Sequence, residues 1–207
     1  MNELTPVKDR TEENTGQSGQ NELQAAQALF GRRRAQGLAA LNSLFRSGTV
    51  PEPPLNGRYV GKLVAIDIAP GLTQLFQSLL NNWLPWLGKT FNAYRQVGDN
   101  IFTQDSYLLA RFFNPFYRGF VADEPRTYRG FVFHTYVAPG LADPDRSVLK
   151  IDYNLEENPS LTVRRVLDEL VQIDDNLYLG KAHVRWWWNA WQTVAYFSLA
   201  RVKPPTA

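Results

Sequence analysis

The residue types that could do chemistry are few. The chain of 207 residues contains two histidines, His134 and His183, and no cysteine. Without cysteine there are no disulfides, thiolate metal sites or cysteine nucleophiles. Two histidines without a set of carboxylates nearby do not make an ordinary metal site, so we expect neither a metal nor a cofactor. Asp152 could form a general acid–base pair with either histidine, but the sequence fixes neither distance.

No other catalytic motif is complete. Gly88-Lys89-Thr90 resembles the end of a phosphate-binding loop, but Trp83 stands where the first glycine of that loop is required. The formal net charge is only +2, so no strong field attracts nucleic acid. We therefore assign no catalytic residue. An enzyme such as an isomerase, cyclase or hydrolase of a hydrophobic substrate stays as an alternative.

Polar residues alternate with apolar ones in two segments that have β-strand character. Lys150 and Asp152 share one face of 147–154, and Lys181, His183 and Arg185 share one face of 177–187. If these faces point into a barrel they form a basic pocket for a carboxylate or phosphate, and if they point outward they form an ordinary wet surface. The candidate ligand-binding residues are Lys150, Asp152, Lys181, His183, Arg185, Tyr59, His134 and Tyr136.

The strands that would position these residues are separated by short turns. We expect eight of them, at about 58–68, 88–97, 101–103, 127–137, 147–154, 166–173, 177–187 and 191–202. Short connections require antiparallel pairing, and closure removes the exposed edges of such aromatic strands. The sequence thus predicts a mainly β fold, an eight-stranded antiparallel barrel with added helices.

Helical periodicity lies outside the strands. We expect a disordered tail at 1–20, a helical segment at 21–48 that glycines weaken in its middle, and a barrel domain at 55–203. Further helices are expected at 72–83, between the first two strands, and at 104–113. Gly98–Asn100 is expected to form a hairpin turn.

A four-residue pattern of aromatic, aliphatic, glycine and lysine occurs three times, beginning at Tyr59, Trp86 and Tyr178. Glycine allows a strand to bend, and an aromatic side chain from a neighbouring strand can cover its bare backbone. We expect this device in a curved, closed sheet, with each lysine at a rim. The alternative is that some of these lysines converge on an anionic ligand.

The opening Gly57-x-Tyr59-x-Gly61 resembles the Gly-x-Trp-x-Gly start of lipocalin-like (calycin) barrels and is similar to short bacterial and nitrobindin-like forms. Tyrosine in place of tryptophan departs from the motif. The resemblance implies binding of a hydrophobic or amphipathic small molecule inside the barrel. Some relatives bind haem through one histidine, but neither His134 nor His183 aligns with such a ligand. Tyr59 fits a role in the core better than a ligand contact.

Aromatic clusters suggest a second alternative, a peripheral membrane protein. They lie at 83–86, 112–117 and 186–191, and arginines occupy 32–34. Such residues either pack the barrel ends or sit at a membrane–water boundary. The helix expected at 72–83 could cover the barrel mouth as a lid. No apolar segment predicts a secretory signal or a membrane span. We therefore expect a cytoplasmic protein, with a hydrophobic small molecule and a possible membrane surface as partners and no nucleic acid. The sequence does not indicate an oligomeric state.

Overall fold

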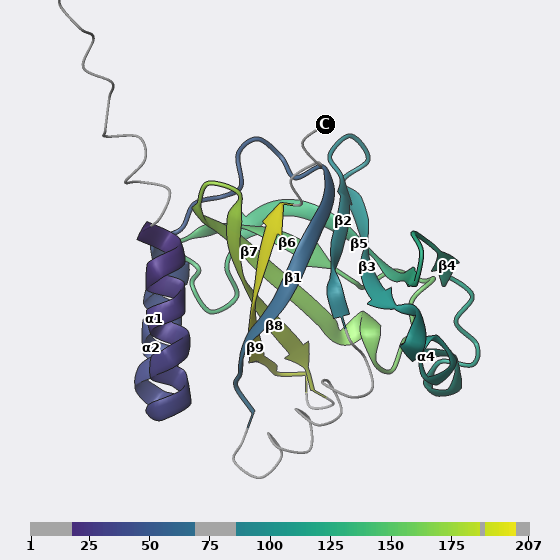
Figure 1. The fold of residues 1–207 in the computed structure, drawn as a ribbon, viewed down its shortest axis with the longest axis horizontal. Helices are drawn as coiled ribbons and strands as arrows, with labels where there is room; N and C mark the ends of the chain where they lie inside the picture. The colour runs from purple at the N-terminus through teal and green to yellow at the C-terminus, as the bar shows by residue number, and fades with distance from the viewer. Residues whose placement is uncertain (1–17, 69–85, 187–188, 202–207) are drawn as a thin grey trace, which may run out of the picture.

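The computed structural model describes residues 18–68, 86–186 and 189–201, and these form a closed antiparallel β-barrel with two helices against its wall (Figure 1). The strands are β1 (Gly57–Ile66), β2 (Trp86–Asn92), β3 (Val97–Thr103), β4 (Val121–Ala122), β5 (Thr127–Pro139), β6 (Ser147–Asp152), β7 (Val166–Asp174), β8 (Leu177–Arg185) and β9 (Trp191–Arg201). Their order is β3-β2-β1-β9-β8-β7-β6-β5-β4, and β3 also pairs with β5. That pairing closes an eight-stranded barrel, as predicted, and β4 is a two-residue addition to β5.

One strand boundary was predicted wrongly. The sequence indicated a turn at Gly98–Asn100, but these residues lie within β3 and the chain reverses at 93–96. The side-chain oxygen of Asn92 accepts a hydrogen bond from Arg95 N at 3.0 Å, and Gln96 has a φ of 53°. Asparagine forms such turns through its own side chain. Asn100 is consequently free to face the barrel interior.

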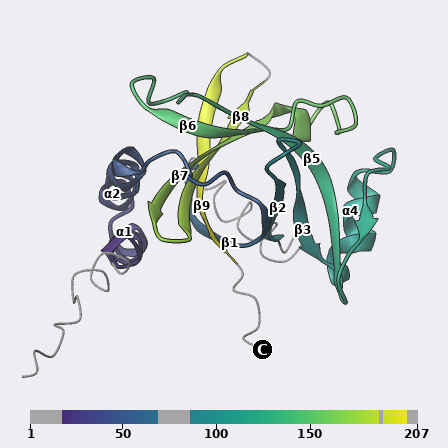
Figure 2. The same cartoon turned by 90° about the horizontal axis from the view of Figure 1, so that it is seen from above.

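Two helices, α1 (Ser18–Arg32) and α2 (Arg34–Ser47), pack side by side outside the barrel (Figure 2). The helical segment is interrupted at Arg33, in the middle part that the sequence predicted to be weak. A Cβ on Gly37 would lie 2.2 Å from the Phe30 backbone, so glycine permits the close approach of the two helices. Their apolar faces cover outward-facing side chains of the barrel wall, which include Val148, Val171 and Leu179.

The remaining described helices are short: η1 (Gln104–Ser106), α4 (Tyr107–Phe113) and η2 (Val163–Arg165). The expected helix at 72–83, most of the expected tail and two of the tryptophans at 186–191 lie outside the described residues. Within the described part of the chain, no helix has the length and hydrophobicity needed to cross a bilayer.

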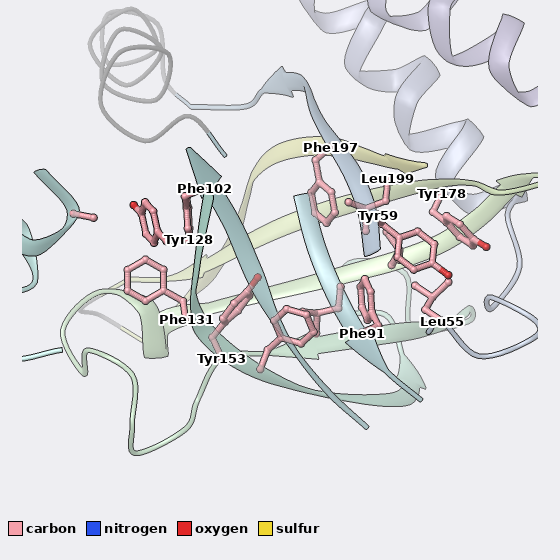
Figure 3. Close-up of a cluster of buried hydrophobic side chains, with 14 of the residues drawn as sticks. Leu55, Tyr59, Phe91, Phe102, Tyr128, Phe131, Tyr153, Tyr178, Phe197 and Leu199 are labelled. Carbon is pink, nitrogen blue, oxygen red and sulfur yellow. The ribbon is translucent and has the colours of Figure 1, made fainter. Parts of the chain in front are cut away.

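The barrel interior contains a continuous aromatic core (Figure 3). The predicted cover over glycine is confirmed at two positions. A Cβ on Gly61 would lie 2.3 Å from the Trp86 ring, and one on Gly180 would lie 2.2 Å from the Phe197 ring. Tyr59 packs edge-on against Phe91 at 5.4 Å between ring centroids, so its expected role in the core is confirmed.

A bulge in β2 changes which side chains face inward. The pairing with β3 shifts between Trp86 and Gly88, where Gly88 has a φ of 147°. A Cβ there would lie 2.0 Å from Tyr59 O, so only glycine fits. Because of this extra residue, both Trp86 and Lys89 point into the barrel, whereas Lys62 and Lys181 follow the regular alternation and point outward. The expectation that each lysine lies at a rim is therefore wrong for Lys89.

Candidate functional site

The strands bring five polar or amphipathic side chains together inside the barrel. We call this set the inner cluster, and it consists of Trp86, Lys89, Asn100, Tyr153 and Asp168. Three strands, β2, β3 and β7, and the residue that follows β6 supply its members. Lys89 is paired with Tyr59 in the β1–β2 ladder, and Asp168 is paired with Ile151 and Ala182, all of which face inward.

Lys89 is the centre of the inner cluster. Its side chain is almost fully buried, and its Nζ donates to Asn100 Oδ1 at 2.9 Å, to Asp168 Oδ2 at 2.9 Å and to Tyr153 OH. Removing an ammonium group from water costs several kcal/mol, and one carboxylate offsets only part of this. Burial of Lys89 therefore lowers the stability of the fold, and the presence of a lysine here needs an explanation.

Hydrogen-bond donors converge on one oxygen of Asn100. Its Oδ1 accepts from Lys89 Nζ, from Trp86 Nε1 at 3.1 Å and from Tyr153 OH at 3.2 Å. The orientation of the amide is fixed because Nδ2 donates to Phe131 O at 3.3 Å. An amide oxygen has two lone pairs, so three donors compete for it. Tyr153 OH also lies 3.3 Å from Asp168 Oδ2 and can donate to that carboxylate instead. The three donors thus meet at one point of the interior, which a further acceptor oxygen could share.

Aromatic rings surround the ammonium group. Lys89 Nζ lies 5.1–5.4 Å from the ring centroids of Trp86, Phe133, Tyr153 and Phe197. Ring faces attract a cation, and this attraction is stronger away from water. The rings also form apolar walls on which a hydrophobic ligand could pack.

Burial changes the protonation behaviour of the inner cluster. The pKa of Lys89 is lowered because burial disfavours its charged form more than the nearby Asp168 carboxylate favours it. The pKa of Tyr153 is raised well above its ordinary value, first by burial and then by the charge of Asp168. Tyr153 therefore keeps its proton at physiological pH and can donate it in a hydrogen bond.

The two ends of the barrel differ in how they are filled. At the end where β1 begins, the buried side chains of Leu55, Tyr59, Phe91 and Tyr178 occupy the interior (Figure 3). At the other end, where β2 begins with Trp86, the buried rings of Phe102 and Tyr128 face inward on β3 and β5, whereas inward positions of β7, β8 and β9 carry small side chains that are only partly buried. These are Val166, Ala182, Val184 and Ala195. We call this second end the Trp86 end.

A second buried charged group, which we call the outer cluster, contains three of the predicted residues. Lys150, Lys181 and His183 point away from the barrel interior, so their expected role in lining an internal pocket is wrong. The outward alternative predicted a wet surface, which is also wrong, because all three are less than 5% exposed. The reason is that α2 and the loop between β5 and β6 cover this part of the wall. The outer cluster consists of Asn42, Arg46, Asp143, Lys150, Glu169, Lys181 and His183.

Carboxylates that are distant in sequence neutralise the outer cluster. Lys181 Nζ donates to Asp143 Oδ2 at 2.5 Å and to Asn42 Oδ1 at 2.6 Å. Lys150 Nζ and Leu141 N both donate to Glu169 Oε1, the latter at 2.6 Å. The outer cluster therefore joins the helix pair, the β5–β6 loop and the barrel wall.

Glu169 is ionised across the physiological range. Burial alone would raise its pKa, but the adjacent His183 ring, at 3.1 Å, and then Lys150 and Leu141 N outweigh that effect and lower the pKa to about 2. The pKa of Asp143 is lowered by Lys181 and Arg46 against an opposing effect of burial. Both carboxylates thus act as stable counter-charges, which is a structural role.

The other predicted residues lie on the outside of the barrel. His134 and Asp152 are cross-strand partners, and Tyr136 OH donates to Asp152 Oδ2 at 3.2 Å. Arg185 lies over the Trp191 ring at 5.7 Å. Among the described residues, no nitrogen–oxygen contact within 4.0 Å joins Asp152 to His134 or His183, and His183 contacts Glu169 instead. The acid–base pair considered from the sequence is therefore not assembled.

The candidate ligand-binding residues chosen from the sequence include no member of the inner cluster. Lys89 was expected at a rim and entered only through the alternative that lysines of the repeated pattern converge on an anionic ligand, and Asn100 was assigned to a turn. One signal was present in Asp168-Glu169, two carboxylates in the middle of an otherwise hydrophobic strand. Adjacent residues in a strand face opposite sides, so one of the two had to point inward.

Other surface features do not coincide with the inner cluster. A hollow of about 540 Å³ lies outside β2, β3 and β5, bordered by Arg95, Asp99, Arg129 and His134. Another of about 380 Å³ lies at the filled end of the barrel, beside Pro53 and Tyr178. In the described ranges, no three His, Asp or Glu side chains are grouped so as to hold a metal ion.

Comparisons with protein families, with curated proteins and with solved structures find no match to this chain. A functional argument therefore depends on the geometry of the barrel.

Proposed function

We propose that the barrel binds an amphipathic small molecule, with an acceptor oxygen of the ligand at the inner cluster and its apolar part among the aromatic rings. The observation that carries this proposal is the convergence of three donors, from Lys89, Trp86 and Tyr153, on Asn100 Oδ1. A carboxylate or carbonyl oxygen of a ligand could accept a hydrogen bond from the same three donors.

Three further features support the proposal. Ligand sites are usually apolar with a few convergent polar groups, as here. A lysine with a lowered pKa in such surroundings is typical of functional sites. The small, partly exposed side chains at the Trp86 end offer a route from solvent. Binding requires the aromatic side chains beside Lys89 to rearrange, because they pack against one another without a ligand.

The resemblance of Gly57-x-Tyr59-x-Gly61 to calycin barrels is in keeping with this proposal. We extend it to a distant relationship with short bacterial, nitrobindin-like forms that bind ligands inside the barrel. An acid–base enzyme on the same barrel has no comparable support, since among the described residues no nitrogen–oxygen contact within 4.0 Å joins Asp152 to either histidine.

The test is the uptake of dansyl-labelled undecanoic acid by the full chain, followed by its fluorescence, together with native mass spectrometry of the purified protein. We expect saturable binding at micromolar concentration. The change Lys89→Met should weaken it about tenfold or more, because a charge-assisted hydrogen bond is lost. Lys62→Met is the matched control, since Lys62 is exposed on the outer face of β1, and it should bind as the unchanged protein does.

A second variant keeps the test valid if Lys89→Met fails to fold. Ala182→Phe places a ring at the Trp86 end without changing any charge, and it should block uptake while the barrel stays folded. The proposal is wrong if the unchanged protein takes up no probe and carries no small molecule. It is equally wrong if Lys89→Met and Lys62→Met bind alike.

A further inference from the structure

Large apolar side chains are exposed on α4 and in the loop that follows it. Leu108 is 81% exposed, Phe112 is 75% exposed and Phe116 is 93% exposed. They occur within nine residues, together with exposed Pro115. Single exposed apolar side chains are normal on a protein surface, but a contiguous group usually marks an interaction site. We call Leu108, Phe112, Pro115 and Phe116 the α4 patch.

The backbone beneath the α4 patch is firmly anchored. The opposite face of α4 is buried through Ala110, and Tyr107 packs against Tyr128 at 5.2 Å between ring centroids. Tyr117, next to the α4 patch, is buried, and its OH accepts a hydrogen bond from Phe131 N at 2.5 Å. The exposed rings are therefore presented by a fixed scaffold and do not result from a frayed helix end.

The connection from α4 to the next loop is also closed by hydrogen bonds. Asn114 N donates to Ala110 O at 3.0 Å and Asn114 Nδ2 donates to the same oxygen at 3.1 Å. Arg111 Nη1 donates to Tyr117 O at 3.0 Å. The chain thus turns back toward the barrel after α4, and the side chain of Phe116 stays exposed to solvent.

The carboxylates around the α4 patch are paired with arginines. Asp105 lies 4.0 Å from Arg126, and Asp123 lies 2.5 Å from Arg58 and 3.2 Å from Arg129. Glu124 also lies 3.8 Å from Arg58. The carboxylates of this region are thus matched by arginines.

Two further arginines, Arg111 and Arg118, are exposed beside the apolar side chains. In the part of the chain that the structure describes, neither has a carboxylate within 4.0 Å. Apolar side chains flanked by arginine match the interface of an anionic bilayer, in which rings enter the acyl boundary and guanidinium groups meet phosphates.

The position of α4 suits contact with a flat surface. The helix follows the end of β3 and projects from the barrel on the side opposite to α1 and α2 in both views (Figure 1, Figure 2). It therefore belongs to the barrel end at which β1 finishes and β2 begins, which is the Trp86 end.

We propose that the α4 patch, with Arg111 and Arg118, docks the protein on an anionic lipid surface. This inference is independent of ligand binding in the barrel. If both hold, docking brings the Trp86 end toward the bilayer, where a lipid-like molecule could pass directly between membrane and barrel.

The test is flotation of the full chain with phosphatidylcholine vesicles that contain or lack phosphatidylglycerol. We expect binding to the vesicles that contain phosphatidylglycerol. The double change L108Q/F116Q should weaken it about tenfold or more, because the buried apolar area is lost. Arg118→Gln should weaken it about fivefold, the contribution of one basic residue near an anionic surface. Both residues are exposed, so the fold should be kept.

Tyr94→Gln is the matched control. Tyr94 is 94% exposed in the turn between β2 and β3, at the far end of the barrel, and its removal should leave binding unchanged. The inference is wrong if the unchanged protein ignores anionic vesicles, or if L108Q/F116Q binds them as well as Y94Q does. It is also wrong if the unchanged protein is a dimer that L108Q/F116Q converts to a monomer without any vesicle binding, since a second copy would then cover the α4 patch.

Discussion

Asp168 and Glu169 are neighbours in β7, yet they belong to two clusters with opposite physical character. Glu169 faces outward and accepts hydrogen bonds from Lys150 Nζ and Leu141 N. Its Oε2 lies 3.1 Å from His183 Nε2. Asp168 faces inward, where Lys89 is the cation that pairs with it. Both carboxylates are buried. Two adjacent residues therefore allow the same chemical group to be compared in two environments.

The difference lies in what the charged groups connect. In the outer cluster each lysine has a short contact to a carboxylate, and the carboxylates reach loops and helices that would otherwise be separate. The inner cluster joins strands that the barrel already holds together, and three donors meet there at the single oxygen of Asn100. We infer that the outer cluster stabilises the fold, whereas the inner cluster costs stability, as expected if it forms the ligand site proposed above.

The largest expected effect is at Glu169. Glu169→Gln keeps the shape of the side chain but leaves Lys150 buried without a counter-charge, which should lower the free energy of unfolding by about 3–5 kcal/mol. The measurement is urea denaturation at neutral pH. Asp152→Asn is the control, since Asp152 lies on the same outer face but is only partly buried, and it should change stability by less than about 1 kcal/mol. Equal losses in both variants would show that the outer cluster has no special role.

An intermediate effect is expected from pH. Glu169 has a pKa of about 2 in the folded protein against an ordinary value of 4.5. The unfolded chain therefore binds a proton more readily than the folded chain between these values. Stability from Glu169 is complete above about pH 4.5 and is lost as the pH falls toward 2, by roughly 3 kcal/mol, since each pKa unit corresponds to about 1.4 kcal/mol. Urea denaturation at a series of pH values should show this decline, and Glu169→Gln should flatten it. Parallel curves for the two proteins would contradict the assignment.

The sequence predicted the closed barrel correctly but not the residues of the inner cluster, and one bulge explains much of this difference. The same four-residue pattern begins at Tyr59, Trp86 and Tyr178, and a regular alternation sends its lysine outward in two cases. In β2 the extra residue at Leu87–Gly88 reverses the alternation, so Lys89 faces inward. Alternation is readable from a sequence, but a bulge depends on how two strands pair.

The outer cluster was missed in part for a different reason. Lys150, Lys181 and His183 were recognised as one polar face, but their burial depends on Asp143 and Arg46, which approach from a loop and a helix. Such contacts join residues 38 and 97 positions apart, to which strand periodicity gives no clue. By contrast, strand spacing, short turns and the glycine–aromatic device are local, and these predicted the closed antiparallel barrel.

The smallest expected effect on stability separates the two clusters most clearly. The double change K89M/D168N removes both charges of the inner cluster while it keeps side-chain volume. Because a buried ion pair often contributes no net stability over uncharged side chains, unfolding by urea should change by less than about 1 kcal/mol, or the protein should become more stable. Uptake of the dansyl probe should be lost in the same variant. A loss of stability as large as that of Glu169→Gln would instead make the inner cluster a structural element like the outer one, and the donors at Asn100 would then serve the fold alone.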